Sequence, residues 1–236
     1  MTAPGFREAD CTLPAADGPL PGGPAVVHFD AHLVVVDKPS GMLSVPGRGP
    51  DKFDSVETRV RAAFPDCPVQ PAAHRLDMDT SGLLVVARSA EAHRHLSRQF
   101  QDRAVTKRYE AVLDGVPEAV ARGEREGEIA LRFRLDPDDR PRQIYDPERG
   151  KPGLTRWRLL GVEKGRARIA FEPLTGRTHQ LRLHAAHRLG LGVPIVGDRL
   201  YGRAASGPRL LLHAALLALR HPADERDVRW TSPPPF

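Results

Sequence analysis

A polar segment joined directly to an apolar run, from His74 to Ser89, restricts the possible fold more than any other feature of this sequence. Its first half holds an imidazole, a guanidinium, two carboxylates and a Thr-Ser-Gly turn. Its second half, residues 83–87, is an unbroken apolar run of strand length, which is typical of a strand buried on both faces. Reactive side chains are often carried on a loop that a rigid strand supports. The segment therefore predicts a catalytic loop on a core strand.

The composition restricts the class of protein. A chain of 236 residues suits one domain, and 40% hydrophobic with 28% charged residues is typical of a soluble globular fold. The formal net charge of +5 favours polyanionic partners. No apolar run approaches the ~18 residues that span a membrane, and residues 1–23 lack the pattern of a signal peptide. Cys11 and Cys67 form neither a metal spacing nor a disulfide framework, so we expect a cytoplasmic protein.

The patterning predicts an α+β fold. Residues 1–24, rich in Pro, Gly and Ala, predict an irregular arm, and residues 25–236 the folded domain. Expected strands outnumber expected helices and many join by short turns, so we expect a mixed, largely antiparallel sheet with helices packed on it. Residues 117–153 are charged and poorly periodic. Strands are expected at 25–29, 33–37, 107–113, 129–133, 155–160, 166–171, 209–214 and 228–230, and helices from Asp54 or Ser55, at 90–101, and from a Thr178 cap to Gly190.

The segment around Asp77 resembles the signature of the RluA-type pseudouridine synthases. Family members read His-Arg-Leu-Asp, two variable residues, Thr-Ser-Gly and an apolar strand, and all the fixed residues stand in register at 74–77 and 80–82. Segments 38–47, 107–109 and 173–184 match the family in the expected order, and the resemblance runs from about Val26 to the C-terminus. It implies a long bent mixed sheet with flanking helices and a central active-site cleft. The arm is too short for the S4-type domain that many relatives carry.

The resemblance also implies a reaction. These enzymes break the N1–C1′ bond of uridine, turn the uracil and rejoin it through C5, after unstacking the nucleotide at a cost of a few kcal/mol. The chemistry needs a carboxylate beside C1′, a cation and an aromatic face, and no redox step, so no cofactor is expected. The resemblance makes Asp77 the catalytic carboxylate. The residues alone leave open whether it attacks C1′ or removes the 2′ proton.

Four substrate-binding residues are implied in the same way. Arg177 would pair with the catalytic carboxylate and keep it ionised, and Tyr109 would stack on the flipped base, which is worth ~1–3 kcal/mol. Arg75 would enter the space that the base vacates. Leu212, chosen over Leu211, would form the floor of the pocket. The structural alternatives are a surface phosphate contact for Arg177, a core aromatic for Tyr109, an ion pair for Arg75 and ordinary core packing for the leucines.

Two other functions stay open. Asp77 and Asp79, ~6.6 Å apart if the chain is extended, would allow a glycosidase, although such carboxylates normally face each other across the substrate. A non-catalytic RNA-binding or assembly factor would use the same basic cleft, but binding alone does not require a carboxylate there. Histidines 179, 184 and 187 lack the spacing of a zinc site, so no metal is expected.

The leading prediction is an isomerase, an RNA pseudouridine synthase. The loop 38–47 and the His-Arg-Leu-Asp-Met run most resemble the RluA branch. That branch implies a uridine of a tRNA anticodon loop and a uridine of 23S ribosomal RNA as substrates, by analogy. We expect RNA as the partner, no membrane association, no protein partner and a monomer.

Overall fold

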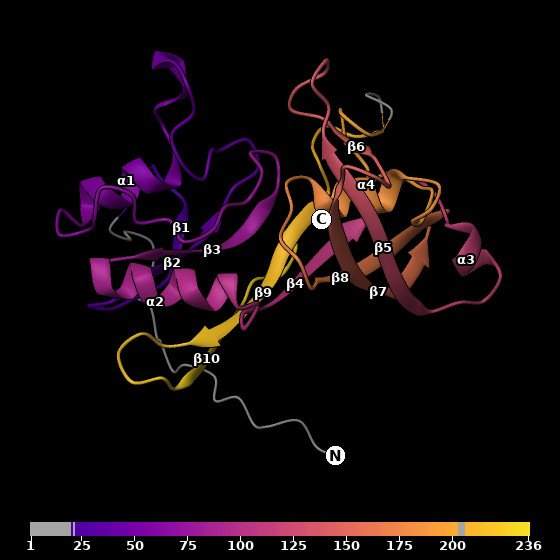
Figure 1. Ribbon diagram of the computed structural model, residues 1–236. Helices are drawn as coiled ribbons and strands as arrows, with labels where there is room; N and C mark the ends of the chain where they lie inside the picture. Colours follow the sequence, from indigo (N-terminus) through magenta and orange to yellow (C-terminus); the bar gives the residue numbers. More distant parts are fainter. Residues whose placement is uncertain (1–19, 21, 203–205) are drawn as a thin grey trace. The chain divides into compact units, whose positions relative to one another are not determined.

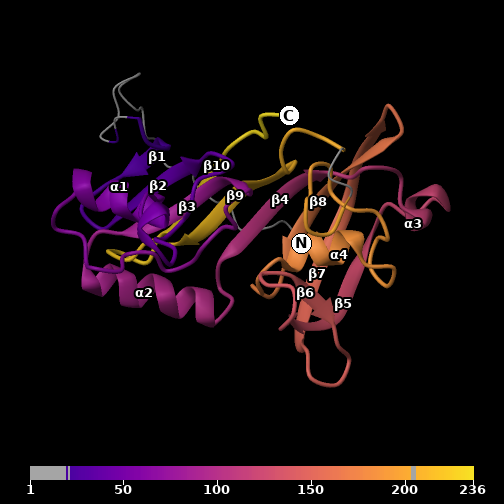
Figure 2. The same cartoon turned by 90° about the horizontal axis from the view of Figure 1, so that it is seen from above.

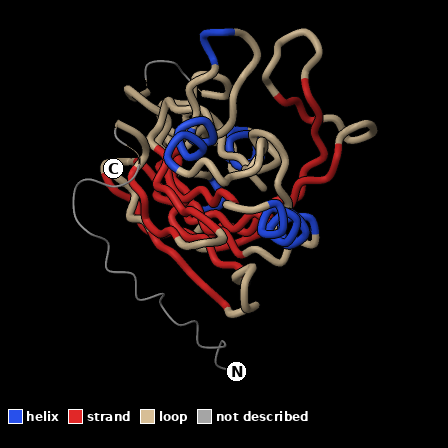
Figure 3. The backbone as a smooth tube through the Cα atoms, turned by 90° about the vertical axis from the view of Figure 1, so that its left-hand side faces the viewer, coloured by secondary structure: helices blue, strands red, loops and turns tan. Residues whose placement is uncertain are grey.

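The structure, a computed structural model, describes residue 20 and residues 22–202 and 206–236. Most of the predicted arm 1–24 lies outside the described residues. Strands form more of the traced chain than helices do (Figure 3), and their hydrogen-bonded order is β1-β2-β3-β9-β4-β8-β7-β5-β6, with β10 beside β9. The chain divides into two compact units, residues 1–107 with 214–235, and residues 108–213 with 236. None of the helices in the described part of the chain is long and apolar enough to cross a membrane.

The first unit is built on β2 and β3, which pair antiparallel from Leu33 opposite Ala87 to Lys38 opposite Gly82. Every residue of β3 is buried, as the apolar run predicts for a central strand. Helix α2 runs alongside β3 (Figure 1) and buries Leu96 in the same core cluster. The elements of this unit are β1 (Ala25–Phe29), β2 (Leu33–Lys38), η1 (Pro50–Lys52), α1 (Val56–Ala63), β3 (Ser81–Ala87), α2 (Ala90–Gln101) and β10 (Asp227–Thr231).

The second unit is an antiparallel sheet with one face covered by α4. In β5 the residues Ile129, Leu131 and Phe133 point into the core and alternate with exposed neighbours. Helix α4 lies beside β7 and β8 (Figure 2). The elements are α3 (Glu118–Ala121), β5 (Glu126–Leu135), β6 (Gln143–Tyr145), β7 (Lys151–Glu163), β8 (Arg166–Pro173) and α4 (Gln180–Ala186); β4 (Thr106–Val112) and β9 (Leu212–Arg220) have residues in both units.

The predicted mostly antiparallel sheet with few helices is confirmed, and Ser55 caps α1 as expected. Both predicted ends of the last helix and the predicted start of β9 are wrong. The last helix is preceded by His179 in the left-handed conformation at φ 54°, not by a Thr178 cap, and it ends at Ala186. Strand β9 begins at Leu212 rather than residue 209, because Leu211 N donates to Val196 O in a neighbouring loop instead of to a strand.

Candidate active site

Asp77 lies in a loop that leads directly into β3. Its side chain is half-buried, and its carbonyl oxygen accepts a hydrogen bond from Thr80 N at 3.1 Å, which closes a turn. The prediction that Asp77 and Asp79 lie ~6.6 Å apart on one side of an extended chain is therefore wrong. The geometric argument for a glycosidase pair rested on that spacing and is lost. Arg75, two residues before Asp77, is exposed.

The backbone beside Asp77 is held by a buried ammonium group. Lys38 donates to the carbonyl oxygens of Met78 at 2.8 Å, Met42 at 2.8 Å and Pro39 at 3.0 Å. Burial lowers the pKa of Lys38 to about 8, while the nearby carboxylates of Asp79 and Asp77 oppose that shift. The ammonium is protonated at neutral pH and uses all three of its donors.

Loop 38–47 adds further bonds to the same segment. Ser44 Oγ donates to Leu76 O at 2.8 Å and accepts from Leu76 N at 3.0 Å. Ser40 Oγ donates to Asp79 O at 2.7 Å. Every residue that flanks Asp77 closely is thus tied to this loop, which is the kind of second layer that fixes a reactive group. Lys38, Ser40 and Ser44 were not predicted as site residues. Their signals were a polar Lys-Pro-Ser-Gly run directly after an apolar strand and the resemblance of segment 38–47 to the family.

Gly82 is required where the loop enters β3. Its φ is +110°, and a Cβ there would lie 2.5 Å from both the N and the O of Ala214 in β9. A side chain would therefore collide with backbone and would also strain the conformation. The glycine of the Thr-Ser-Gly turn allows β9 to pass close to the loop that carries Asp77.

His74 anchors the other end of the loop. Its Nε2 accepts a hydrogen bond from Val85 N at 3.1 Å, and its ring stacks on Phe100 of α2 with centroids 4.3 Å apart. Burial, with a smaller contribution from the Lys107 cation, lowers the pKa of His74 to about 3. The imidazole is therefore neutral and acts as an acceptor, which ties the loop to β3.

This neutral imidazole predicts a pH dependence of stability. Below pH 6.5 the unfolded state takes up a proton on His74 that the folded state does not bind. The free energy of unfolding therefore decreases as the pH is lowered, by up to ~1.4 kcal/mol per pH unit. His184, whose pKa burial lowers to about 4, acts in the same direction. We expect His74→Gln to flatten the dependence between pH 6.5 and 4.5 by roughly half. Urea unfolding at several pH values checks this, and an unchanged slope would contradict it.

Arg177 lies on the loop between β8 and α4, and its side chain is exposed. Its backbone N donates to Gln180 Oε1 at 3.1 Å, and its Nε lies 3.4 Å from Pro152 O. Gln180 is buried; it also accepts from Thr175 Oγ1 at 2.7 Å and donates to Leu154 O at 3.0 Å. Gln180 therefore fixes the backbone that presents Arg177, a role that was not assigned from the sequence.

Arg182, which matches the family segment, is a structural residue. It forms two hydrogen bonds to Asp198, at 2.9 and 2.7 Å, and the side chains are 4% and 0% exposed. Asp198 also accepts from the backbone N of Leu200 and Tyr201. Removing either partner would leave an uncompensated buried charge, so the pair holds the loop after α4 in one conformation.

Tyr109 and Leu212 lie in one part of the second unit. Tyr109, on β4 opposite Phe171 of β8, is half-buried and packs against the core cluster that contains Leu212. Leu212 is 3% exposed, whereas Leu211 is half-buried. Of the predicted site residues, Tyr109, Arg177 and Leu212 belong to the second unit, and Arg75 and Asp77 to the first.

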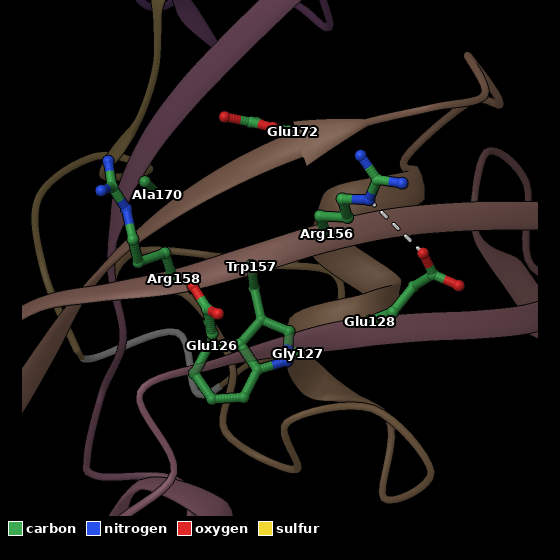
Figure 4. A pocket seen from close by; sticks show the side chains of 8 residues that line it. All are labelled: Glu126, Gly127, Glu128, Arg156, Trp157, Arg158, Ala170 and Glu172. Atoms are coloured by element: carbon green, nitrogen blue, oxygen red, sulfur yellow. Dashed lines mark ion pairs between the residues drawn. The ribbon is translucent and has the colours of Figure 1, made fainter. Parts of the chain in front are cut away.

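A cavity of about 540 Å³ lies on the β5–β7–β8 sheet (Figure 4). Its charges compensate each other: Arg156 Nε is 3.6 Å from Glu128 Oε2, a contact drawn in the figure. It contains no predicted site residue, and its carboxylates make it a poor place for a polyanion. Its lining residues are Glu126, Gly127, Glu128, Arg156, Trp157, Arg158, Ala170 and Glu172.

The three histidines of segment 179–187 have separate surroundings. His179 Nδ1 is 3.0 Å from Tyr201 Oη, His184 packs edge-on against Phe133, and His187 contacts Tyr145. Within the part of the chain that the structure describes, no cluster of three or more His, Cys, Asp or Glu side chains has the arrangement of a metal site.

The chain is similar to known proteins in sequence and in fold. The sequence model described as RNA pseudouridylate synthase matches residues 32–187. The dual-specificity RNA pseudouridine synthase RluA of Pasteurella multocida is 45% identical over 215 residues, which cover 89% of this chain and 93% of that protein. The solved structure of human RNA pseudouridylate synthase domain containing 1 has a TM-score of 0.71 at 30% identity, covering 95% of this chain and 87% of that one. Human RNA pseudouridylate synthase domain containing 4 has the same fold, with a TM-score of 0.70 at 24% identity, covering 92% and 90%.

Proposed function

Because this chain belongs to the RNA pseudouridylate synthase family and is an isomerase of that class, we propose that Asp77 is its catalytic carboxylate and that it modifies two kinds of RNA. The substrates are a uridine in a tRNA anticodon loop and a uridine in 23S ribosomal RNA. Residues 25–236 form the catalytic domain, which works in the cytoplasm as a monomer. The observation that carries the proposal is the rigid presentation of Asp77, whose neighbours on both sides are bonded to loop 38–47.

The reaction conserves all atoms of the nucleotide except one exchanged hydrogen. The N1–C1′ bond breaks, the uracil turns, a C5–C1′ bond forms, and the proton on C5 is lost to solvent while N1 gains one. Asp77 acts on the ribose, by attack at C1′ or by removal of the 2′ proton, and either role requires an ionised carboxylate that does not move. The bonds from Lys38 and Ser44 supply that rigidity, and both are made to backbone carbonyl oxygens beside Asp77.

The remaining predicted residues bind the nucleotide. Arg177 pairs with the carboxylate, while Tyr109 stacks on the displaced uracil. Arg75, exposed beside the loop, enters the gap that the flipped base leaves in the RNA. Leu212 supports the pocket from the core.

Tritium release tests the proposed function. Transcripts of a tRNA and of a large-subunit rRNA fragment, labelled at uridine C5, should release tritium to water with the wild-type chain, because the C5 hydrogen must leave. Release from only one transcript would narrow the substrate to that RNA. Absence of release from both, with binding intact, would contradict the dual substrate proposal.

Affinity for the transcripts should depend strongly on salt. Each phosphate that a Lys or Arg neutralises in single-stranded RNA contributes a slope of roughly −0.7 in a plot of log K against log salt. We expect a linear decrease, and its slope divided by ~0.7 gives the number of phosphates that the protein neutralises. Filter binding at several salt concentrations checks this. A flat dependence would argue against RNA as the substrate.

A further inference from the structure

Tyr145 and His187 form a partly exposed ring pair in the second unit. Tyr145 ends β6, and His187 is the residue at the C-terminal end of α4. The ring centroids are 4.9 Å apart, with the planes tilted by 38°. Tyr145 is 36% exposed, and Leu189, two residues beyond the histidine, is 50% exposed. Burial, helped by the cation of Arg188, lowers the pKa of His187, so its ring is neutral at neutral pH.

Two exposed cations belong to the surroundings of this ring pair. Phe133 of β5 pairs with Tyr145 on one side and with Lys151 of β7 on the other. The exposed Lys151 therefore lies two strand spacings from Tyr145, ~10 Å. Arg188, next to His187, is also exposed. Of the two acids that follow β6, Asp146 is bonded to Arg134 Nε at 2.6 Å, and Glu148 is exposed next to the cation of Arg149 in sequence.

The two ends of β5 therefore differ in character. At the end that holds Glu126 and Glu128, each carboxylate faces an arginine across the sheet, Arg158 and Arg156 respectively, around the cavity of Figure 4. At the Phe133 end, the rings of Tyr145 and His187 contact each other, and Lys151 and Arg188 are exposed nearby. Aromatic faces interleaved with cations are the surface that unpaired nucleotides bind, because bases stack on rings while phosphates contact Lys and Arg.

We propose that Tyr145 and His187 stack against an unpaired base of the substrate RNA, and that Lys151 and Arg188 bind the phosphates beside it. This rests on the proposed function, since it names a second contact of the same RNA. Helix α4 separates this ring pair from the Arg177 loop by ~10 Å, at 1.5 Å per residue. With the target uridine at Arg177, as proposed above, an RNA strand that runs along α4 at ~3.4 Å per stacked nucleotide would place the bound base about three nucleotides from the target.

Kinetics with base-deleted RNA test the stacking. Tyr145→Ala should raise KM for a structured transcript by roughly tenfold, the scale of one lost stacking contact, with kcat within about twofold of wild type. Tyr145→Phe should match wild type. Transcripts with an abasic nucleotide at position two, three or four from the target should be tested one at a time. At one of these positions the missing base should raise KM of the wild type by the same roughly tenfold factor. At that position it should not raise KM of Tyr145→Ala any further.

Leu160→Ala is the matched control, since Leu160 is a similarly exposed apolar side chain, 41% exposed, on β7. It should leave KM unchanged. An unchanged KM for Tyr145→Ala would overturn the proposal. So would a KM for Tyr145→Ala that every abasic substitution raises by the same factor as it raises the wild-type KM. If wild type releases no tritium from any transcript, the proposed function fails. In that case, filter binding of wild type and Tyr145→Ala to the same RNA still decides whether the ring pair binds a base.

Discussion

Asp77→Asn should abolish turnover while RNA binding stays within about threefold of wild type. The amide has the size of the carboxylate but can neither attack C1′ nor accept the 2′ proton, so we expect kcat to fall by at least roughly 10²–10⁴-fold. The loop should keep its conformation, because Lys38, Ser40 and Ser44 bond to its backbone rather than to the Asp77 side chain. Single-turnover tritium release and filter binding measure the two quantities separately.

Asp79→Asn is the control for this variant. Asp79 lies in the same turn, is half-buried like Asp77 and has the same charge relation to Lys38, so its loss reproduces the electrostatic change without removing the proposed catalytic group. We expect it to retain activity within about tenfold. Appreciable activity of Asp77→Asn, or an inactive Asp79→Asn beside an active Asp77→Asn, would show that the catalytic carboxylate was misassigned.

Lys38→Met should lower both stability and kcat. The substitution keeps the length of the side chain but removes the ammonium donor from the carbonyl oxygens of Met78, Met42 and Pro39. Met78 O keeps its second bond, from Gly41 N at 2.9 Å. Unsatisfied buried acceptors cost ~1–3 kcal/mol each, and with partial relaxation we expect a total loss of about 3 kcal/mol in the free energy of unfolding. Because the Met78 carbonyl is next to Asp77, we expect kcat to fall more than KM rises.

Urea unfolding and steady-state kinetics measure these effects. Lys52→Met serves as the control, because Lys52 is exposed, and its substitution should change neither stability nor kcat. A Lys38→Met protein with wild-type stability and wild-type kcat would refute the role of the buried ammonium. A protein that is destabilised but fully active at low temperature would limit Lys38 to a folding role.

Local sequence patterns predicted the elements whose buried residues form a regular pattern within a short stretch of sequence. The apolar run before Arg88 becomes β3, buried at every position, and the 3.6-residue spacing at 90–101 becomes α2. Segment 117–153 was harder to interpret, because in β5 only Ile129, Leu131 and Phe133 face the core and their charged neighbours obscure the alternation. The start of α4 was missed because the buried side chain of Gln180, not Thr178, bonds the preceding turn.

The candidate site divides in the same way. The position of Asp77 on a loop before a core strand was predicted from contiguous residues. The supports of that loop were not, because the bonds from Lys38 to Met78 and from Ser44 to Leu76 join residues 40 and 32 positions apart. Such contacts depend on how β2 and β3 pair, and no pattern within a short window encodes them. The Gln180 network, which reaches back to Leu154, is hidden for the same reason.

Nucleoside analysis of treated RNA is the most direct test of the central claim. A tRNA transcript and a large-subunit rRNA fragment would each be incubated with wild type or Asp77→Asn, digested to nucleosides and separated by chromatography. The account predicts that wild type converts one uridine per transcript to pseudouridine, and that Asp77→Asn, although it binds the same transcript, converts none. Pseudouridine formed equally by both proteins, or formed by neither while wild type binds both RNAs tightly, would contradict it.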